Sequence, residues 1–193
     1  DSVVSTTIEI INRTTKNGLL FLPGMSDIKY VIEKLNNMVS QVISIPLSSS
    51  VTKMMNWDRF SNYEKVFLKK DPNDVLNFKK SEVLEYFLAD KDINEFPTGG
   101  NSKRVLIVAT DIAEASLTFS NLNYVIDVGF RKVNQFVDGM LKLSLIPIAE
   151  TNRLQRRGRV GRTEAGEVFY LYDTSAQIPL YYKICQANNI TNQ

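Results

Sequence analysis

Residues 105–109 read Val-Leu-Ile-Val-Ala, and every one of them is apolar. An extended chain with this composition would be covered on both of its faces, as strands are inside a parallel sheet that carries helices on each side. Polar residues follow at once, at Thr110 and Asp111, where a loop would begin. The segment therefore predicts an α/β domain built on a mainly parallel sheet.

Apolar runs of similar length flank this segment in both directions. We predict further strands at residues 18–22, 42–47, 124–128 and 168–172. Between the first two strands, apolar residues recur at the spacing of one helix face, and Ser26 or Asp27 is placed to cap that helix. The alternation of strands and helices predicts a three-layer α/β domain that includes residues 1–193 as one unit.

Two segments depart from this alternation. Residues 52–95 are rich in charged and aromatic residues and lie between two predicted strands, so we predict a helical insertion there. Residues 131–146 contain two extended stretches around Asp138-Gly139. Because an Asp-Gly pair favours the tight turn of a two-residue hairpin loop, this segment predicts a projecting β-hairpin.

Composition excludes several classes of function. The chain has 23 basic and 21 acidic residues, a formal net charge of +2, no histidine and one cysteine, Cys185. A nucleic-acid site must therefore be a local patch, and imidazole catalysis and an internal disulfide are ruled out. A zinc or other metal site is not expected. No apolar run approaches the roughly 20 residues of a membrane span, and no signal peptide is visible, so we expect an intracellular protein of undetermined compartment.

The strongest chemical signal is the octapeptide at residues 155–162, Gln-Arg-Arg-Gly-Arg-Val-Gly-Arg. On a helix, Gln155, Arg159 and Arg162 would share one face. Gly158 and Gly161 would each cost a helix interior roughly 1 kcal/mol relative to Ala, which predicts that a ligand approaches the backbone closely. Arginine forks suit a polyphosphate whose charge grows in a transition state. The alternative is a basic helix that lies on nucleic-acid phosphates.

Four stretches resemble, in order, motifs of the second RecA-like domain of superfamily 2 helicases, in particular the DEAH-box and flaviviral-type group. Residues 20–28 resemble motif IV, residues 108–118 motif V, residues 125–130 the strand after it, and the octapeptide motif VI. Arg157, Val160 and Asp111 are closer to the flaviviral type, which favours a viral protein. Ser120 stands where DEAH-box proteins often carry an aspartate that holds the ribose. The resemblance implies a RecA-like fold.

The resemblance also implies how the chain would act on a nucleotide. ATP with Mg²⁺ would bind between two RecA-like domains, where Arg159 and Arg162 would serve as arginine fingers and Gln155 would order the γ-phosphate and the attacking water. Phe96 would stack on adenine, unless it is a core aromatic beside Pro97. In motif V, the hydroxyls of Ser116 and Thr118 would face the nucleotide or couple the nucleotide site to the nucleic-acid site.

The sequence contains neither a phosphate-binding loop nor an acidic magnesium motif. In the family these belong to the first RecA-like domain, so we expect that domain upstream in a longer protein, where it would hold ATP and Mg²⁺. The isolated chain is accordingly expected to be inactive.

On a second ligand face, the resemblance implies contacts to a nucleic-acid backbone. The residues expected to make them follow strands or open a helix, and they are Gly24, Ser48, Ser49, Thr110 and Asp111. The alternative for the serines is ordinary loop solvation. The hairpin around Asp138 and Gly139 resembles the one with which these helicases part strands, and the alternative is that it packs against another domain.

Together these features predict the second RecA-like domain of an ATP-dependent RNA helicase that acts on single-stranded or duplex RNA, with DNA left open. The first alternative is a nucleic-acid-dependent NTPase module that remodels ribonucleoprotein without unwinding. A non-catalytic binding domain is the second, and in that case Arg159 and Arg162 would be dispensable for turnover.

Overall fold

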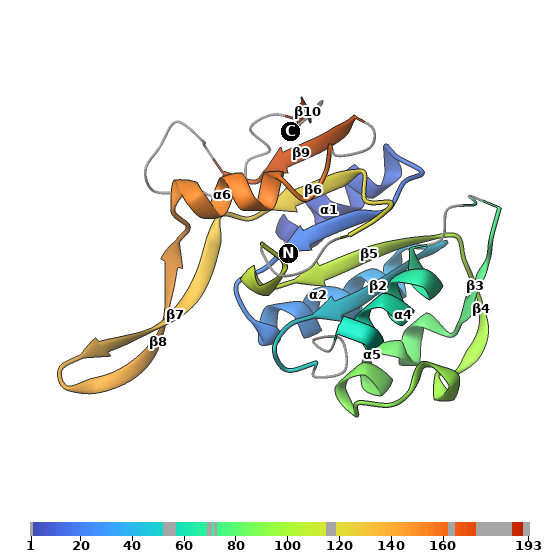
Figure 1. Ribbon diagram of the computed structural model, residues 1–193, viewed down its shortest axis with the longest axis horizontal. Helices are drawn as coiled ribbons and strands as arrows, with labels where there is room; N and C mark the ends of the chain where they lie inside the picture. The colour runs from blue at the N-terminus through green and yellow to red at the C-terminus, as the bar shows by residue number, and fades with distance from the viewer. Residues whose placement is uncertain are drawn as a thin grey trace.

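The computed structural model describes residues 2–51, 57–68, 71, 73–114, 119–161, 165–172 and 187–190. Its centre is a six-stranded sheet with the order β10-β9-β6-β1-β5-β2 (Figure 1). All neighbouring strands are parallel except β10, which runs antiparallel to β9. The strands are β1 Gly18–Phe21, β2 Val42–Leu47, β5 Arg104–Ala109, β6 Tyr124–Asp127, β9 Gly166–Tyr170 and β10 Ala187–Ile190. The predicted mainly parallel sheet is confirmed.

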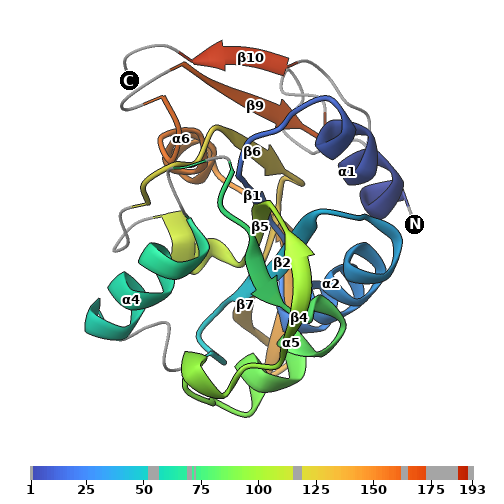
Figure 2. The ribbon, with the colours of Figure 1, turned by 90° about the vertical axis from the view of Figure 1, so that its right-hand side faces the viewer.

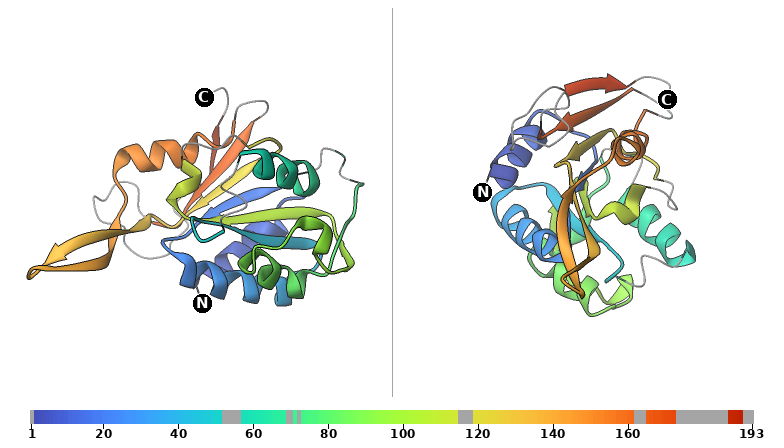
Figure 3. Two further views of the ribbon diagram at one scale, coloured as in Figure 1. Left: turned by 60° about the horizontal axis from the view of Figure 1, so that its bottom comes forward. Right: turned by 90° about the vertical axis from the view of Figure 1, so that its left-hand side faces the viewer.

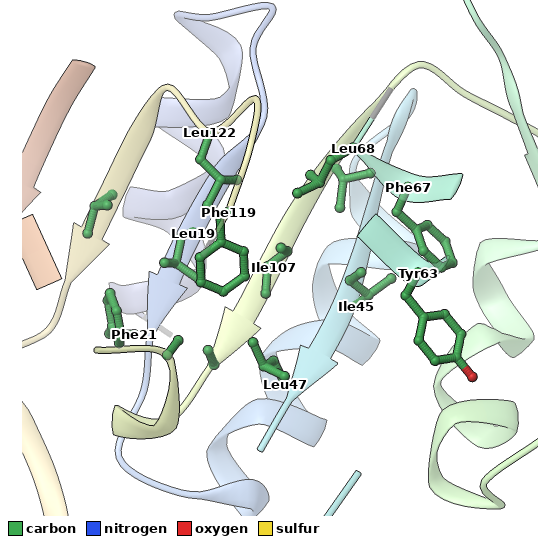
Figure 4. Close-up of a cluster of buried hydrophobic side chains, with 14 of the residues drawn as sticks. Leu19, Phe21, Ile45, Leu47, Tyr63, Phe67, Leu68, Ile107, Phe119 and Leu122 are labelled. Carbon is green, nitrogen blue, oxygen red and sulfur yellow. The ribbon is translucent and has the colours of Figure 1, made fainter. Parts of the chain in front are cut away.

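Helices cover both faces of this sheet. On one face lie α1 (Ser2–Asn12) and α2 (Met25–Met38), and on the other lies α4 (Trp57–Phe67) (Figure 2). Successive strand residues point to opposite faces, so Leu20 packs in the cluster beneath α1 and α2 while Leu19 packs in the cluster beneath α4. Figure 4 shows this second cluster, which strands and α4 build together. The predicted three-layer architecture is confirmed.

The helix after β1 begins earlier than the sequence predicted. It starts at Met25, with Gly24 as its N-cap in an extended conformation and no side-chain cap. Ser26 and Asp27 lie in the first turn, so the prediction that one of them is the N-cap was wrong. Asp27 still favours the helix from there, because an acidic side chain in the first turn interacts well with the helix dipole.

The segment predicted as a helical insertion contains α4 and α5 (Lys80–Leu88), and it also contains a strand that the sequence did not predict. This strand, β3 (Leu76–Phe78), pairs antiparallel with β4 (Thr98–Ser102), and the short helix η1 (Ile93–Glu95) precedes β4. Aromatic side chains of the insertion pack together and onto the sheet, among them Tyr63, Phe67, Phe87 and Phe96.

Asn36 hydrogen-bonds the free edge of the sheet at Ser44 of β2. Its side-chain amide donates to the carbonyls of Ser44, at 3.2 Å, and Lys80, at 3.1 Å, while its oxygen accepts the backbone N–H of Ser44 at 2.8 Å. These bonds replace those that a further strand would make. The same side chain therefore ties α2 to β2 and to the start of α5.

The predicted hairpin is present and projects away from the sheet (Figures 1 and 3). It consists of β7 (Phe130–Val137) and β8 (Met140–Pro147), paired antiparallel from Phe130↔Pro147 to Val137↔Met140. Asp138 and Gly139 have φ angles of 53° and 77°, and two consecutive positive values are those of a type I′ turn. In the part of the chain that the structure describes, no helix is long and apolar enough to cross a bilayer.

Candidate nucleotide and nucleic-acid site

The candidate site lies at the carboxyl edge of the parallel strands, where open α/β sheets place their ligands. The loops that leave β1, β2 and β5 are held side by side there. The N–H of Leu22 donates to the carbonyl of Ala109 at 2.8 Å, and the N–H of Thr110 donates to that of Leu47 at 3.1 Å. The short helix η2 (Asp111–Glu114) follows β5, so three loops form one polar edge.

The structure separates the residues predicted to contact nucleic acid. Ser49 is exposed, and Thr110 and Asp111 are half-buried at this edge. Ser48 is only 2% exposed; its hydroxyl donates to the sulfur of Met25 at 3.1 Å and accepts the N–H of Ser50 at 3.2 Å. The Ser48 hydroxyl therefore holds the loop in shape in this structure, and the contact of Ser48 with nucleic acid stays a prediction.

Gly24, also predicted to contact nucleic acid, is half-buried beneath a side chain of the hairpin. A Cβ added there would lie 2.9 Å from Cδ of Lys132. The Lys132 ammonium reaches on to Asp27, at 3.5 Å, and to the hydroxyl of Ser26, at 3.5 Å. The base of the hairpin thus lies on the loop after β1.

The octapeptide is only partly helical. Helix α6 (Glu150–Arg157) ends at its C-cap, Gly158, and the chain continues in tight turns, with the N–H of Arg159 bonded to the carbonyl of Arg156 at 3.2 Å. Val160 then enters the core, and Gly161 has φ 82°. The prediction that Gln155 and Arg159 share a helix face was therefore wrong. Arg162 lies outside the described residues.

The two glycines of the octapeptide have different roles. Gly161 occupies the left-handed region, which favours glycine. Gly158 has φ −67°, and a Cβ there would meet only carbonyl oxygens of its own helix, with Leu154 O at 3.3 Å. Gly158 therefore marks the end of α6, and the close ligand approach predicted from both glycines is not needed to explain either of them.

Arg156 forms the electrostatic centre of the site. Its side chain is 0% exposed; Nε donates to Glu114 Oε2 at 2.7 Å and Nη1 donates to Asp127 Oδ1 at 2.7 Å. Nη2 donates to the carbonyl of Phe130 at 3.3 Å, and the guanidinium lies 4.8 Å from the ring centroid of Phe21. One side chain therefore contacts η2, the end of β6, the start of the hairpin and the end of β1.

A second ring of hydrogen bonds completes both carboxylates. Glu114 Oε1 accepts from the amide of Asn152 at 2.8 Å. Asp127 Oδ1 also accepts the N–H of Gly129 at 2.8 Å, and its Oδ2 accepts the hydroxyl of Tyr172 at 2.8 Å. Each carboxylate oxygen thus has a donor, as buried charges require.

The network also changes proton affinities. Burial alone would lower the pKa of Arg156, but the carboxylates of Asp127 and Glu114 outweigh it and raise that pKa above its ordinary value. Burial raises the pKa of Tyr172, and Asp127 raises it further. Arg156 is therefore a permanent cation and Tyr172 a neutral donor at neutral pH.

Gln155, the candidate water-ordering residue, and Arg159, one of the two candidate fingers, lie at the surface end of this network. Gln155 is exposed in the last turn of α6, and Arg159 is half-buried just beyond it. Earlier on the helix, Arg153 pairs with Glu150 and its guanidinium lies 6.0 Å from the ring centroid of Tyr170. Cationic side chains here also interact favourably with the carboxyl end of the helix dipole.

Phe96 does not offer a face to adenine. It is 3% exposed and packs among other rings, with centroids 4.8 Å from Phe87 and 5.8 Å from Tyr86. The structure gives Phe96 the core role that was the alternative. The other predicted nucleotide contacts, Ser116 and Thr118, lie outside the described residues.

Ser120, the position of the expected ribose aspartate, is engaged within the chain. Its backbone N–H donates to Glu64 Oε1 at 3.1 Å, and its hydroxyl donates to the same oxygen. This bond links the loop after motif V to α4.

The acidic residues of the site are poor candidates for magnesium ligands. Glu114 and Asp127 are both bound by Arg156, whose positive charge offsets part of their combined negative charge, and across the described ranges no group of three or more His, Cys, Asp or Glu side chains is placed to hold a metal ion.

A mainly parallel α/β sheet with an arginine-rich segment at its carboxyl edge and a hairpin beside it defines a RecA-like domain of the helicase type. Residues 64–164 match the family model described as "Helicase conserved C-terminal domain". The match includes just over half of the chain, so the chain belongs to this family, and the resemblance stated from the sequence is confirmed.

The relatives are of the DEAH-box type. A protein of Acanthamoeba polyphaga mimivirus, named as an ATP-dependent RNA helicase, is 31% identical over 97% of this chain and 10% of its own length. The Arabidopsis thaliana pre-mRNA-splicing factor ATP-dependent RNA helicase DEAH10 is 33% identical over 54% of this chain and 15% of its own. The chain thus spans a small part of the curated relatives it matches.

Among solved structures, the E. coli DExH-box NTPase HrpB has the same fold. It superposes with a TM-score of 0.64 and 24% identity over 90% of this chain and 17% of that chain.

Proposed function

We propose that this chain is the second RecA-like domain of an ATP-dependent RNA helicase and that it supplies Arg159 and Arg162 as arginine fingers. Membership of the helicase C-terminal family and the names of the relatives support the helicase assignment. In this proposal ATP and Mg²⁺ are held mainly by another RecA-like domain, and Gln155 orders the γ-phosphate and the attacking water.

The observation that carries the proposal is the buried clamp around Arg156. Two 2.7 Å hydrogen bonds from Arg156 to carboxylates anchor the last turn of α6. Arg159, three residues further on, therefore extends from a helix end that is held in place. A preorganised guanidinium stabilises the charge that grows on the transferring phosphoryl group without reorganising at the moment of reaction. Such fingers are worth about 10³ to 10⁵ in turnover.

The RNA backbone would lie along the loops after the strands. Ser49, Thr110, Asp111 and the backbone at Gly24 border one polar edge, which suits contacts that bind phosphates without reading bases. We assign the substrate as RNA because the relatives are named as RNA helicases.

We further propose that the hairpin acts as the strand-separating wedge. Side chains alternate between the two faces of the hairpin. One face carries four exposed apolar side chains, whose exposed fractions are 79% for Phe136, 60% for Leu141, 65% for Leu143 and 56% for Leu145. A rigid apolar ribbon of this kind can block the second strand of a duplex.

The same apolar face favours the second candidate function, a module that remodels ribonucleoprotein without unwinding and uses the hairpin to dock another domain. A strand-displacement assay with the complete protein separates the two functions. Duplex separation that depends on ATP supports the helicase, and ATP turnover without it supports the remodelling module.

The finger assignment is tested by Arg159→Ala and Arg162→Ala in the complete protein. Either change should lower ATP turnover by about 10³-fold while RNA affinity stays nearly intact, because the charge acts in the transition state. Arg157→Ala is the matched control, since it removes the same charge from the same segment and should keep most of the turnover. Preserved turnover with weaker, less salt-dependent RNA binding would instead show that the segment is a phosphate-binding patch.

A further inference from the structure

Four elements that serve different parts of the proposed reaction meet at one buried side chain. Arg156 lies in the octapeptide at residues 155–162, which we call the finger segment. It donates to Glu114 of motif V, to Asp127 at the end of β6 and to the carbonyl of Phe130, the first residue of the hairpin. The described side chains include no other arginine that is fully buried.

We propose that Arg156 is a positioning residue that joins the finger segment and the strand-separating hairpin into one rigid unit, so that movement at the nucleotide is transmitted to the duplex. The inference rests on the proposed function. Arg156 acts through Arg159 on one side and through β7 on the other, and it touches no ligand itself because it is 0% exposed.

Both strands of the hairpin are attached to α6, by different means. The second strand, β8, ends at Pro147, and α6 begins at Glu150, so a short covalent link joins them. The first strand, β7, has no such link, and the bond from Arg156 to Phe130 O supplies the connection. The N–H of Ile148 donates to the carbonyl of Gly129 at 3.0 Å and closes the base between the two strands. Without Arg156 the hairpin would be held to α6 from one side only.

The rigid unit also reaches the predicted RNA edge. Lys132 of β7 packs over Gly24, and its ammonium lies 3.5 Å from Asp27 in the first turn of α2. A tilt of the hairpin would therefore move the loop that follows β1. Arg156 thus stands between the finger segment, the hairpin and the RNA edge.

A guanidinium is the one cationic side chain that suits this task. Its planar fork donates in several fixed directions, and here it reaches groups on three separate elements at once. A lysine would keep the positive charge beside Glu114 and Asp127, but its compact ammonium could not hold all three acceptors in the same geometry. Arg156→Lys therefore weakens the positioning while it keeps the charge balance of the core.

The test measures coupling in the complete protein. Arg156→Lys should leave the KM for ATP and the RNA affinity within a few-fold of normal and lower kcat by roughly 10- to 100-fold. It should also lower the coupling ratio, which is the number of base pairs separated per ATP hydrolysed. The control is Tyr172→Phe, which removes a buried hydrogen bond to the same Asp127 but leaves every donor of Arg156 in place. It should lower thermal stability and leave the coupling ratio unchanged.

If Arg156→Lys does not fold, the variant to test is the triple substitution Arg156→Met, Glu114→Gln and Asp127→Asn, which replaces the charged network with neutral side chains. This variant removes the unpaired buried charges and should fold, yet show the same loss of coupling. A normal kcat and coupling ratio in either folded variant overturns the inference, as does an equal loss of coupling in Tyr172→Phe. Unchanged turnover in Arg159→Ala would overturn the proposed function instead, so the two failures are distinguishable.

Discussion

At the scale of single residues, the site depends on how neighbouring groups stabilise a buried charge. An arginine removed from water is strongly destabilising unless its donors and the partner charges are all satisfied. Arg156 meets this condition with two carboxylates, a carbonyl and an aromatic ring. The carboxylates in turn are completed by Asn152, Gly129 and Tyr172. Removal of one partner should therefore weaken several elements together.

Tyr172 gives this network a pH dependence that can be measured. Burial and the Asp127 carboxylate raise its pKa above the ordinary value of 10.0. The unfolded chain would ionise this group near pH 10 while the folded chain would not, so the stabilisation is complete below about pH 10 and is lost as the pH rises above it. The free energy of unfolding should fall by up to about 1.4 kcal/mol per pH unit for this tyrosine.

Tyr172→Phe should reduce that slope, measured by urea unfolding between about pH 10 and about pH 11.5. The slope should not vanish, because burial also raises the pKa of Tyr124, which the variant keeps. Identical slopes in the two proteins would contradict the assigned environment of Tyr172.

Residue roles were harder to predict than residue classes. The octapeptide pointed to arginine chemistry, but no local pattern distinguished the buried Arg156 from the arginines at the surface. Its partners come from 42 and 29 positions earlier in the chain, and only the fold brings them together. A usable signal was a lone acidic residue near the end of an apolar strand, as at Asp127 in β6. Phe96 was misassigned for the same reason, since its aromatic neighbours lie in the insertion.

At the scale of elements, the hairpin illustrates how the pairing register decides which side chains share a face. Because residues opposite one another share a face, Phe136 pairs with Leu141 and Asn134 with Leu143 on the apolar side. A shift by one residue would move these side chains to the other face. The Asp138-Gly139 turn prevents that shift, since its two positive φ angles fix a two-residue loop.

The hairpin tip should matter for unwinding and not for hydrolysis. Replacing residues 137–140 with a shorter polar turn in the complete protein should leave RNA-stimulated ATP turnover within a few-fold of normal, while duplex separation drops far more, because the tip is exposed and carries no residue assigned to the nucleotide. Phosphate release and strand displacement on the same preparation provide the measurement. Equal loss of both activities would mean that the hairpin supports domain docking, and loss of neither would place strand separation elsewhere.

Elements with a continuous apolar pattern were predictable, and short mixed ones were not. The central strands follow from runs such as residues 105–109, which only a covered sheet accommodates. The strand β3 has three residues and a mixed burial pattern, so its pairing with β4 depends on the tertiary packing of the insertion. Helix α6 stops at Gly158 because Val160 must enter the core, a constraint that helix periodicity does not contain.

At the scale of the whole molecule, the proposed reaction is divided between two domains. This chain carries cationic groups at the carboxyl edge of its sheet, and two carboxylates there, those of Glu114 and Asp127, are paired with Arg156. Its sequence has no phosphate-binding loop. The matched relatives are far longer than this chain, since the aligned part covers 10% of the mimivirus protein and 15% of the Arabidopsis protein. In our proposal, the chain completes an NTPase site whose phosphate-binding half lies on another RecA-like domain.

The most direct measurement of this claim is phosphate release by the isolated chain, folded and supplied with ATP, Mg²⁺ and RNA. We expect cooperative unfolding, poor affinity for ATP and no hydrolysis above buffer, because fingers without a phosphate-binding partner have no bound γ-phosphate to act on. Turnover that follows the chain through purification, rises with RNA and is lost in Arg159→Ala would contradict it, because the chain would then contain a complete site of its own.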